Sequence, residues 1–248
     1  MHPHELAILF SGGTDSLALY ALAAAGRHPQ LPRPQKIHLL HMLNGMSRFH
    51  DFPRQRYLAA EKILTSQATN DFPAATFKEL DMGRLFQGLW LDHYETLMPR
   101  YGGKNLVCVA CKVGMHARAV LYCIEYYVPV LAVGYTSKQR HYPEQTPVFM
   151  DHLAAFSKHF GVTTIFPVYE DFSSKMITRH VLEDLGLPST GGGERKCLFC
   201  QTATTATEKE IDHYLGDMLP TVRTYIEHRI EGRLRAAADC FPAGRVAL

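Results

Sequence analysis

The 248-residue sequence carries little net charge and lacks the marks of a membrane or secreted protein. Its 26 Lys and Arg residues nearly balance 24 Asp and Glu residues, which leaves a formal net charge of +2. This charge is too small to indicate a nucleic-acid-binding protein by itself. No apolar run approaches the roughly 20 residues that span a bilayer, and the N-terminus lacks the basic segment of a secretory signal. We therefore expect a cytoplasmic protein without a membrane partner.

The sequence also lacks internal repeats, and its composition is that of one ordinary globular unit with a small extension. Short apolar runs alternate with segments that have helical periodicity, which predicts an α/β fold. Strands are expected at 6–10, 37–43, 75–80, 128–133 and 163–168, and helices at 15–25, 53–67, 84–97, 112–127, 151–160 and 174–185. We expect a doubly wound, five-stranded and mostly parallel sheet over residues 1–190. Residues 191–248 would then form a cysteine-containing segment and a helical C-terminal tail.

A glycine-rich hexad follows the first expected strand and precedes the first expected helix. It reads Ser11-Gly12-Gly13-Thr14-Asp15-Ser16. Glycines allow backbone N–H groups to close on an anion, and the positive end of a helix points to the same place. Asp15 would repel a phosphate unless Mg²⁺ lay between them. A plain glycine-rich turn is the alternative, which the complete hexad disfavours.

The hexad resembles the Ser-Gly-Gly-x-Asp-Ser signature of the N-type PP-loop ATP pyrophosphatases, and the likeness extends over about residues 6–187. It is not a Walker A loop, which would need Gly-Lys-Ser/Thr. The resemblance implies an adenine nucleotide alpha hydrolase-like fold. It also implies that ATP is cleaved between its α and β phosphates and that AMP is joined to a substrate oxygen. Asp15 would then be catalytic.

The same resemblance implies further nucleotide contacts. His41 and Asn44 would pack against adenosine, Gly134 would line the nucleotide site, and Lys175 would bind phosphate and act in catalysis. One departure concerns the segment after the fourth strand, where many relatives carry Gly-His-x-x-Asp-Asp. This chain has Gly-Tyr-Thr-Ser-Lys-Gln over 134–139. Both carboxylates are absent, and Glu144 or Asp151 could substitute for them.

Six cysteines include two Cys-x-x-Cys pairs, Cys108 with Cys111 and Cys197 with Cys200. Each pair can chelate one metal centre, as Zn²⁺ or an iron–sulfur cluster requires. We expect both pairs near the phosphate loop, the first just before a helix and the second after a glycine-rich turn. The two single cysteines, Cys123 and Cys240, are expected only to pack.

The context of the first pair is similar to that of the tRNA 2-thiocytidine and 2-thiouridine synthetases, through Cys108, Cys111, Arg118, Leu121 and Tyr122. This resemblance implies a [4Fe–4S] cluster held by the first pair and one later cysteine, either Cys197 or Cys200. The presence of two candidates keeps Zn²⁺ open. A metal-free persulfide route, with Cys200 as a catalytic thiol, is a third option.

A second likeness is to 7-cyano-7-deazaguanine synthase, which uses zinc. It rests on Tyr142-Pro143-Glu144, on Ser174-Lys175 and on the Leu-Gly-Leu-Pro run at 185–188. Three functions therefore stay open. The first is an adenylating sulfurtransferase that acts on a nucleobase, with tRNA and a sulfur donor as partners. The second is an ATP-dependent amidation or nitrile-forming enzyme with structural zinc. The third is a nucleotide-binding protein without turnover.

The C-terminal tail combines basic and aromatic residues, which suits an RNA backbone with exposed bases. Its basic side chains are Arg223, His228, Arg229, Arg233 and Arg235. A packed amphipathic helix with a solvated basic face is the alternative for this segment. A homodimer is the assembly considered.

Overall fold

A computed structural model of the chain describes residues 5–31, 33–46, 51–67, 72–101, 106–189, 197 and 205–240, without the side chains of 233–240. The strands are β1 (Glu5–Leu9), β2 (Lys36–Leu43), β3 (Ala74–Asp81), β4 (Val130–Val133) and β5 (Thr163–Ile165). The helices are α1 (Thr14–Ala25), α2 (Phe52–Gln67), α3 (Gly83–Leu89), α4 (Tyr94–Tyr101), α5 (Leu106–Glu125), α6 (Pro147–His159), α7 (Lys175–Asp184) and α8 (Glu208–Cys240). Three 3₁₀ turns are η1 (Leu91–His93), η2 (Ser137–Gln139) and η3 (Pro143–Gln145).

The five strands form one parallel sheet in the order β3-β2-β1-β4-β5. Strand β1 is central, with Leu6 opposite Ile37 of β2 on one side and Val130 of β4 on the other. The chain moves outward from β1 to β3, returns to β4 and then moves outward in the other direction. This order confirms the doubly wound α/β fold. It also creates a topological switch point between β1 and β4, where ligands bind in such folds.

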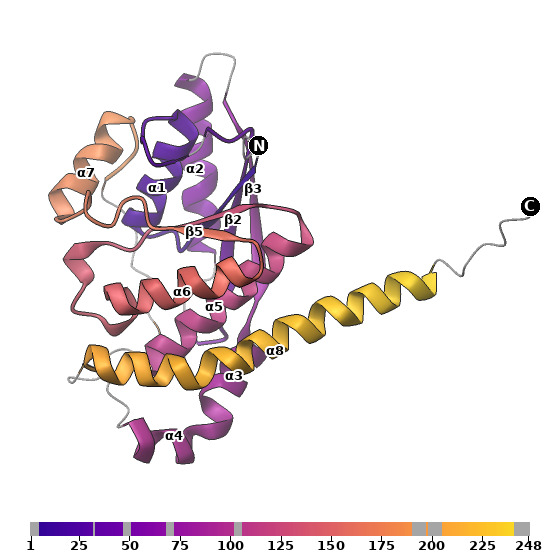
Figure 1. The fold of residues 1–248 in the computed structure, drawn as a ribbon. Coiled ribbons are helices and arrows are strands. Elements are labelled where there is room, and N and C mark those ends of the chain that lie inside the picture. The colour runs from indigo at the N-terminus through magenta and orange to yellow at the C-terminus, as the bar shows by residue number, and fades with distance from the viewer. Residues whose placement is uncertain are drawn as a thin grey trace, which may run out of the picture.

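Helices cover both faces of the sheet because β1 is apolar on both sides (Figure 1). Successive side chains of a strand point to opposite faces. Ala7 accordingly joins a core with α3, α5, α6 and α8, whereas Leu6 and Ile8 join a core with α1, α2 and α7. All three side chains are fully buried. The sheet is therefore an internal layer that presents only its edges and strand ends to ligands.

Three expected helices have different bounds in the structure. The helix expected at 151–160 begins instead at Pro147, and the Thr146 side chain caps it. The helix expected at 84–97 is interrupted at Trp90, whose backbone leaves the helical region at φ −137° and ψ −55°. Trp90 is only 2% exposed, and its ring centroid lies 6.0 Å from that of Tyr214 in α8. Burial of this large side chain accompanies the break. The helix expected to start at 112 begins instead at Leu106, so the first cysteine pair lies inside α5.

Helix α8 shares the core of the α/β unit along its first half. Ile211, Tyr214, Leu215, Val222 and Ile226 are buried in the core that contains α5 and α6. Beyond this part the helix extends away from the rest of the molecule (Figure 1). Tertiary packing therefore positions the start of the predicted tail.

Within the described residues, α5 is the one helix long and apolar enough to cross a membrane, with a mean hydropathy of 1.5. In its apolar window, 67% of the residues are buried inside the fold. The core helix of a globular domain has the same properties.

Candidate functional site

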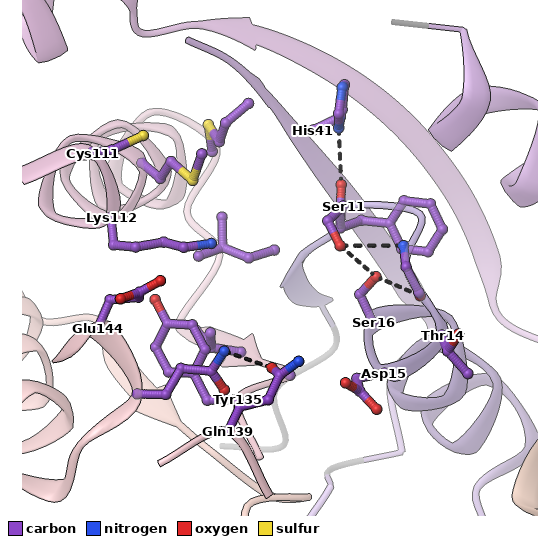
Figure 2. A pocket seen from close by; sticks show the side chains of 18 of the residues that line it. Ser11, Thr14, Asp15, Ser16, His41, Cys111, Lys112, Tyr135, Gln139 and Glu144 are labelled. Atoms are coloured by element: carbon purple, nitrogen blue, oxygen red, sulfur yellow. Dashed lines mark hydrogen bonds between the residues drawn. The ribbon is translucent and has the colours of Figure 1, made fainter. Parts of the chain in front are cut away.

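A cavity of about 510 Å³ opens at the carboxyl ends of β1, β2 and β4. Figure 2 shows Ser11, Thr14, Asp15 and Ser16 on one wall and Cys111, Lys112 and Glu144 on the facing wall. We call the first wall the phosphate end. The second wall, which Cys108 and Cys197 also line, is the cysteine end. The cavity thus occupies the switch point of the sheet, and it brings together two motifs that lie far apart in the sequence.

The phosphate end is built by the turn between β1 and α1. Ser11 and Ser16 share a hydrogen bond of 3.1 Å between their hydroxyls, and the amide of Gly13 donates to Ser11 Oγ at 3.2 Å. Gly12 has a φ of +76°, and a Cβ there would lie 2.7 Å from Pro53 Cα, so only glycine fits. Gly13 is the N-cap residue of α1, and no side chain caps this end of the helix. The positive end of α1 therefore stands at the cavity with a narrow turn beside it.

Asp15 projects from the first turn of α1 and forms an ion pair with Lys138, which follows β4. Lys138 Nζ also donates to Thr178 Oγ1 at 2.9 Å, and Thr178 donates to Asp15 Oδ1 at 3.1 Å. All three residues line the cavity. Sequence reasoning missed Lys138 and Thr178 as site residues. The available signal was the position of Lys138, which takes the place of the first Asp in the Gly-His-x-x-Asp-Asp pattern that the sequence lacks.

The other residues expected at the nucleotide line the same cavity, apart from Gly12, which shapes the turn behind it. His41 is buried, and its Nδ1 lies 3.0 Å from the Phe10 carbonyl oxygen. Asn44 donates to Cys111 Sγ at 3.4 Å. Gly134 packs against α1, where a Cβ would lie 3.4 Å from Ser16 Cα. Lys175 is exposed, at the first position of α7.

The two acidic residues considered as substitutes for the missing carboxylates differ in position. Asp151 is exposed on α6 and is not part of the cavity lining. Glu144 does line the cavity, but on the cysteine end, facing the phosphate loop across the open space (Figure 2). Asp151 therefore cannot take the missing role, and Glu144 belongs to another part of the site.

Helix α5 brings Cys108 and Cys111 to the cysteine end. They lie three residues apart, so one helical turn places them as neighbours on one face. The pKa of Cys108 is raised to about 12, mainly by burial and to a smaller extent by the nearby Glu144 and Cys111. Cys108 is therefore a neutral thiol in this arrangement. Cys123 of the same helix is buried in the core, away from the cavity lining.

Cys197 lines the cavity with the first pair, whereas Cys200 lies outside the described residues. Within the part of the chain that is described, no three His, Cys, Asp or Glu side chains are grouped closely enough to hold a metal ion. The described thiols share a cavity, but by themselves they do not form a metal centre.

Glu144 is a half-buried residue at the cysteine end, and one of its carboxyl oxygens is buried. Its Oε2 atom has no hydrogen-bond partner among the described residues. Burial raises the pKa of Glu144, while the charge of Lys112 opposes that shift. Figure 2 shows Lys112 and Glu144 next to each other on this wall. The cysteine end therefore presents a carboxyl oxygen that is removed from water and has capacity for a hydrogen bond.

Comparison with known proteins gives only distant structural similarity. No family model matches the sequence, and no curated protein matches it. The U34-tRNA thiolase NcsA from Methanococcus maripaludis, solved with its [4Fe-4S] cluster, aligns over 95% of this chain and 74% of its own length, with 18% identity and a TM-score of 0.42. A predicted subunit of tRNA methyltransferase from Methanocaldococcus jannaschii aligns over 78% of this chain and 96% of its own, with 15% identity and a TM-score of 0.41. Similarities this low do not define a reaction.

Proposed function

We propose that this chain is an ATP pyrophosphatase that adenylates an acceptor inside the cavity. One observation carries the proposal. The Ser11–Ser16 hexad forms a turn at the carboxyl end of the central strand and the start of α1, and it lines a cavity large enough for a nucleotide. A turn of this kind at a switch point binds phosphate groups through backbone N–H donors and a helix N-terminus.

Different cavity residues would bind different parts of the nucleotide. Loop amides and the hydroxyls of Ser11 and Ser16 would bind the triphosphate, and Lys175 would approach it from the rim. His41 and Asn44 line the cavity near the carboxyl end of β2, where the adenosine would pack. Asp15 is the one carboxylate on the phosphate end among the described lining residues, so it fits a role in holding Mg²⁺. When bound, this ion would neutralise phosphate charge.

Adenylation requires little covalent chemistry from the protein. An acceptor oxygen attacks the α-phosphorus, a new P–O bond forms, and the bond from the α-phosphorus to the bridging oxygen breaks. Pyrophosphate leaves with the electron pair of that bond. Fixed N–H donors and nearby cations stabilise the negative charge that develops on the phosphate oxygens. A lined cavity also keeps water away from the adenylated acceptor.

The acceptor we propose is a nucleobase carbonyl, as part of tRNA or as a smaller molecule. Adenylation converts its oxygen into a good leaving group. Sulfide-level sulfur, supplied by a separate sulfur donor and held at the cysteine end, would then form a C–S bond with the adenylated carbon, and AMP would leave with the electron pair of the broken C–O bond. A [4Fe–4S] cluster would be held by Cys108, Cys111 and one later cysteine, either Cys197 or Cys200, whereas the alternative Zn²⁺ would take all four thiolates. The described thiols do not complete such a centre, so metal content is a separate experimental question.

A second candidate function is supported by Lys138. Its ammonium group forms an ion pair with Asp15, the residue that would otherwise hold a metal ion. A cation fixed there is compatible with a protein that binds a nucleotide without turning it over. An amidation or nitrile-forming reaction remains the alternative that keeps turnover.

The test uses protein purified under anaerobic conditions, with ATP, Mg²⁺ and unmodified bulk tRNA. The proposal predicts pyrophosphate release that rises when tRNA is added, together with a visible absorption band if the centre is an iron–sulfur cluster. ATP binding without pyrophosphate release under any acceptor condition would favour the nucleotide-binding protein. Zinc without iron, together with turnover on a small carboxylate, would favour the amidation reaction.

A further inference from the structure

We infer that Lys138 is a phosphate-binding residue, a cation anchored to Asp15 that performs part of the charge neutralisation usually left to a metal ion. The inference rests on the proposed ATP site and specifies how this chain fills it. The sequence lacks the Gly-His-x-x-Asp-Asp pattern of the family that the hexad resembles, and Lys138 takes the sequence position of its first Asp. The structure places the Lys138 ammonium group against Asp15.

Three elements meet at the ammonium group of Lys138. Asp15 comes from α1, Thr178 comes from α7, and Lys138 itself lies in η2 after β4. The Lys138 side chain is 11% exposed and that of Asp15 is 18% exposed, while Thr178 is fully buried. The Phe172 ring centroid lies 5.9 Å from Lys138 Nζ and limits its movement on another side. A surface ion pair would not be held by so many neighbours.

The ammonium group of Lys138 has more hydrogen-bond donors than its protein partners use. An ammonium group has three N–H donors and no acceptor. Asp15 and Thr178 take two of them. The Phe172 ring is a weak electrostatic partner at the outer limit of cation–π range. One donor therefore remains for a phosphate oxygen in the cavity that Lys138 lines.

The charges at the phosphate end also favour phosphate binding by Lys138. A lone carboxylate in the first turn of α1 would repel the phosphates that the loop attracts. With Lys138 attached, the pair is neutral, and the positive end of α1 is no longer opposed. Lys175 and Arg179 also line this part of the cavity, so the phosphate end has a net positive charge. The wild-type protein should then hold ATP even without a divalent metal.

A purely structural ion pair is the competing explanation, since Lys138 joins α1 to α7. The two explanations differ in their dependence on metal. A structural pair affects the fold and lowers ATP affinity equally with and without Mg²⁺. A phosphate-binding ammonium group contributes most when Mg²⁺ is absent, because the ion then cannot replace it.

The experiment measures ATP affinity by calorimetry in excess Mg²⁺ and in excess chelator, for the full chain and for Lys138→Met. We expect Lys138→Met to bind ATP about 10-fold to 100-fold more weakly in chelator, the range for a charge-assisted hydrogen bond. In Mg²⁺ the loss should be smaller. Lys138→Arg, which keeps the charge, should recover part of the affinity in chelator. Lys158→Met, a change at an exposed residue of α6, is the matched control and should behave as wild type.

The outcomes separate this inference from the proposed function. If wild type binds ATP and Lys138→Met binds it equally well in chelator, the inference is wrong and the ATP site stands. The same holds if the loss is equal in both conditions. If wild type binds no ATP in either condition, the proposed function itself fails. Should Lys138→Met not fold, Thr178→Val removes one anchor and should show the same metal-dependent loss at smaller size; no loss in chelator would contradict the inference.

Discussion

The two ends of the cavity differ in how completely their polar groups are satisfied. At the phosphate end, Ser11 bonds to Ser16, and Asp15 is bound by Lys138 and Thr178. At the cysteine end, a carboxyl oxygen of Glu144 is buried without a partner among the described residues. The first end is therefore preorganised before any ligand arrives, whereas the second has binding capacity that a ligand would complete.

This difference matches the two tasks that we assign to the cavity. Charge stabilisation during phosphoryl chemistry is most effective when donors are fixed in advance, because no reorganisation is then needed. Sulfur or acceptor handling needs groups that become engaged only when substrate is present. Strain and unsatisfied groups concentrate at such functional positions.

The largest effect is expected at the phosphate end. Asp15→Asn should reduce pyrophosphate release by at least about 100-fold, the scale of removing one charge-stabilising group from an active site. The neutral amide cannot anchor Lys138 or hold Mg²⁺. Asp184→Asn, at an exposed position of α7, is the control and should keep full activity. Normal turnover by a folded Asp15→Asn protein would contradict the assignment of the phosphate end.

The next effect tests whether the cysteine end and the phosphate end function independently. Cys111→Ser should remove bound metal and abolish sulfur transfer to the acceptor, because serine does not replace a thiolate ligand. ATP affinity should change less than about two-fold, a free-energy change well under the 1.4 kcal/mol that a ten-fold change represents. Metal analysis and ATP calorimetry on one preparation measure both quantities.

Cys123→Ala is the control for this variant, since Cys123 is buried in the core outside the cavity lining. It should retain metal and acceptor activity at a modest cost in stability. If Cys111→Ser lost ATP binding as strongly as metal, the two ends would be one coupled site and the comparison would fail.

A smaller effect is expected from the C-terminal tail. Arg229 is exposed on α8, and the side chains of Arg233 and Arg235 lie outside the described residues. Replacement of all three with Ala should lower the slope of log affinity for tRNA against log salt by about 2, since each lost phosphate contact removes about 0.7. ATP affinity should not change. An unchanged salt slope would exclude the tail as an RNA contact.

The smallest effect is on stability at the cysteine end. Because the pKa of Glu144 is raised in the fold, its protonated form is favoured there, so its stabilising contribution is present at low pH. That contribution is lost as pH rises through the folded pKa. Glu144→Gln stays neutral and should be more stable than wild type at pH 8 by about 1 kcal/mol, the low end for relief of a buried unsatisfied group. The difference should disappear near the unfolded pKa of 4.5.

Urea unfolding at the two pH values measures this difference, and Lys138→Met is the matched comparison from the phosphate end. That variant leaves Asp15 without its cation, so it should be less stable than wild type by about 1 kcal/mol or more. A Glu144→Gln protein that is less stable at pH 8 would show that Glu144 is a satisfied carboxylate. The proposed contrast between the two ends would then be wrong.

Sequence reasoning predicted the parts of the fold that local patterns determine. Buried parallel strands are apolar runs, and the turn chemistry of Gly12 and Gly13 marks the first βα connection, so the sheet and the loop were predictable. The break at Trp90 was not, because it accompanies packing against Tyr214, which is distant in sequence. The early start of α5 was also missed, and with it the helical setting of Cys108.

The site was predictable as a collection of motifs but not as an arrangement. Comparison with the Gly-His-x-x-Asp-Asp pattern indicated that both of its carboxylates are absent after the fourth strand. The sequence could not show that Lys138 there contacts Asp15, because the pairing depends on how η2 and α1 pack. The role that the sequence suggested for Glu144 was to substitute for the missing carboxylates at the second Mg²⁺ contact. Its location on the opposite wall follows from η3 lying against α5, which is a tertiary contact.

The fate of the phosphorus atoms of ATP tests the central claim most directly. Protein purified under anaerobic conditions is incubated with Mg²⁺, bulk tRNA and ATP labelled at either the α or the γ phosphorus. Cleavage between the α and β phosphates predicts that the α label appears in AMP or in an adenylated acceptor, and that the γ label appears in pyrophosphate. Recovery of the α label in ADP and of the γ label in inorganic phosphate would contradict the account.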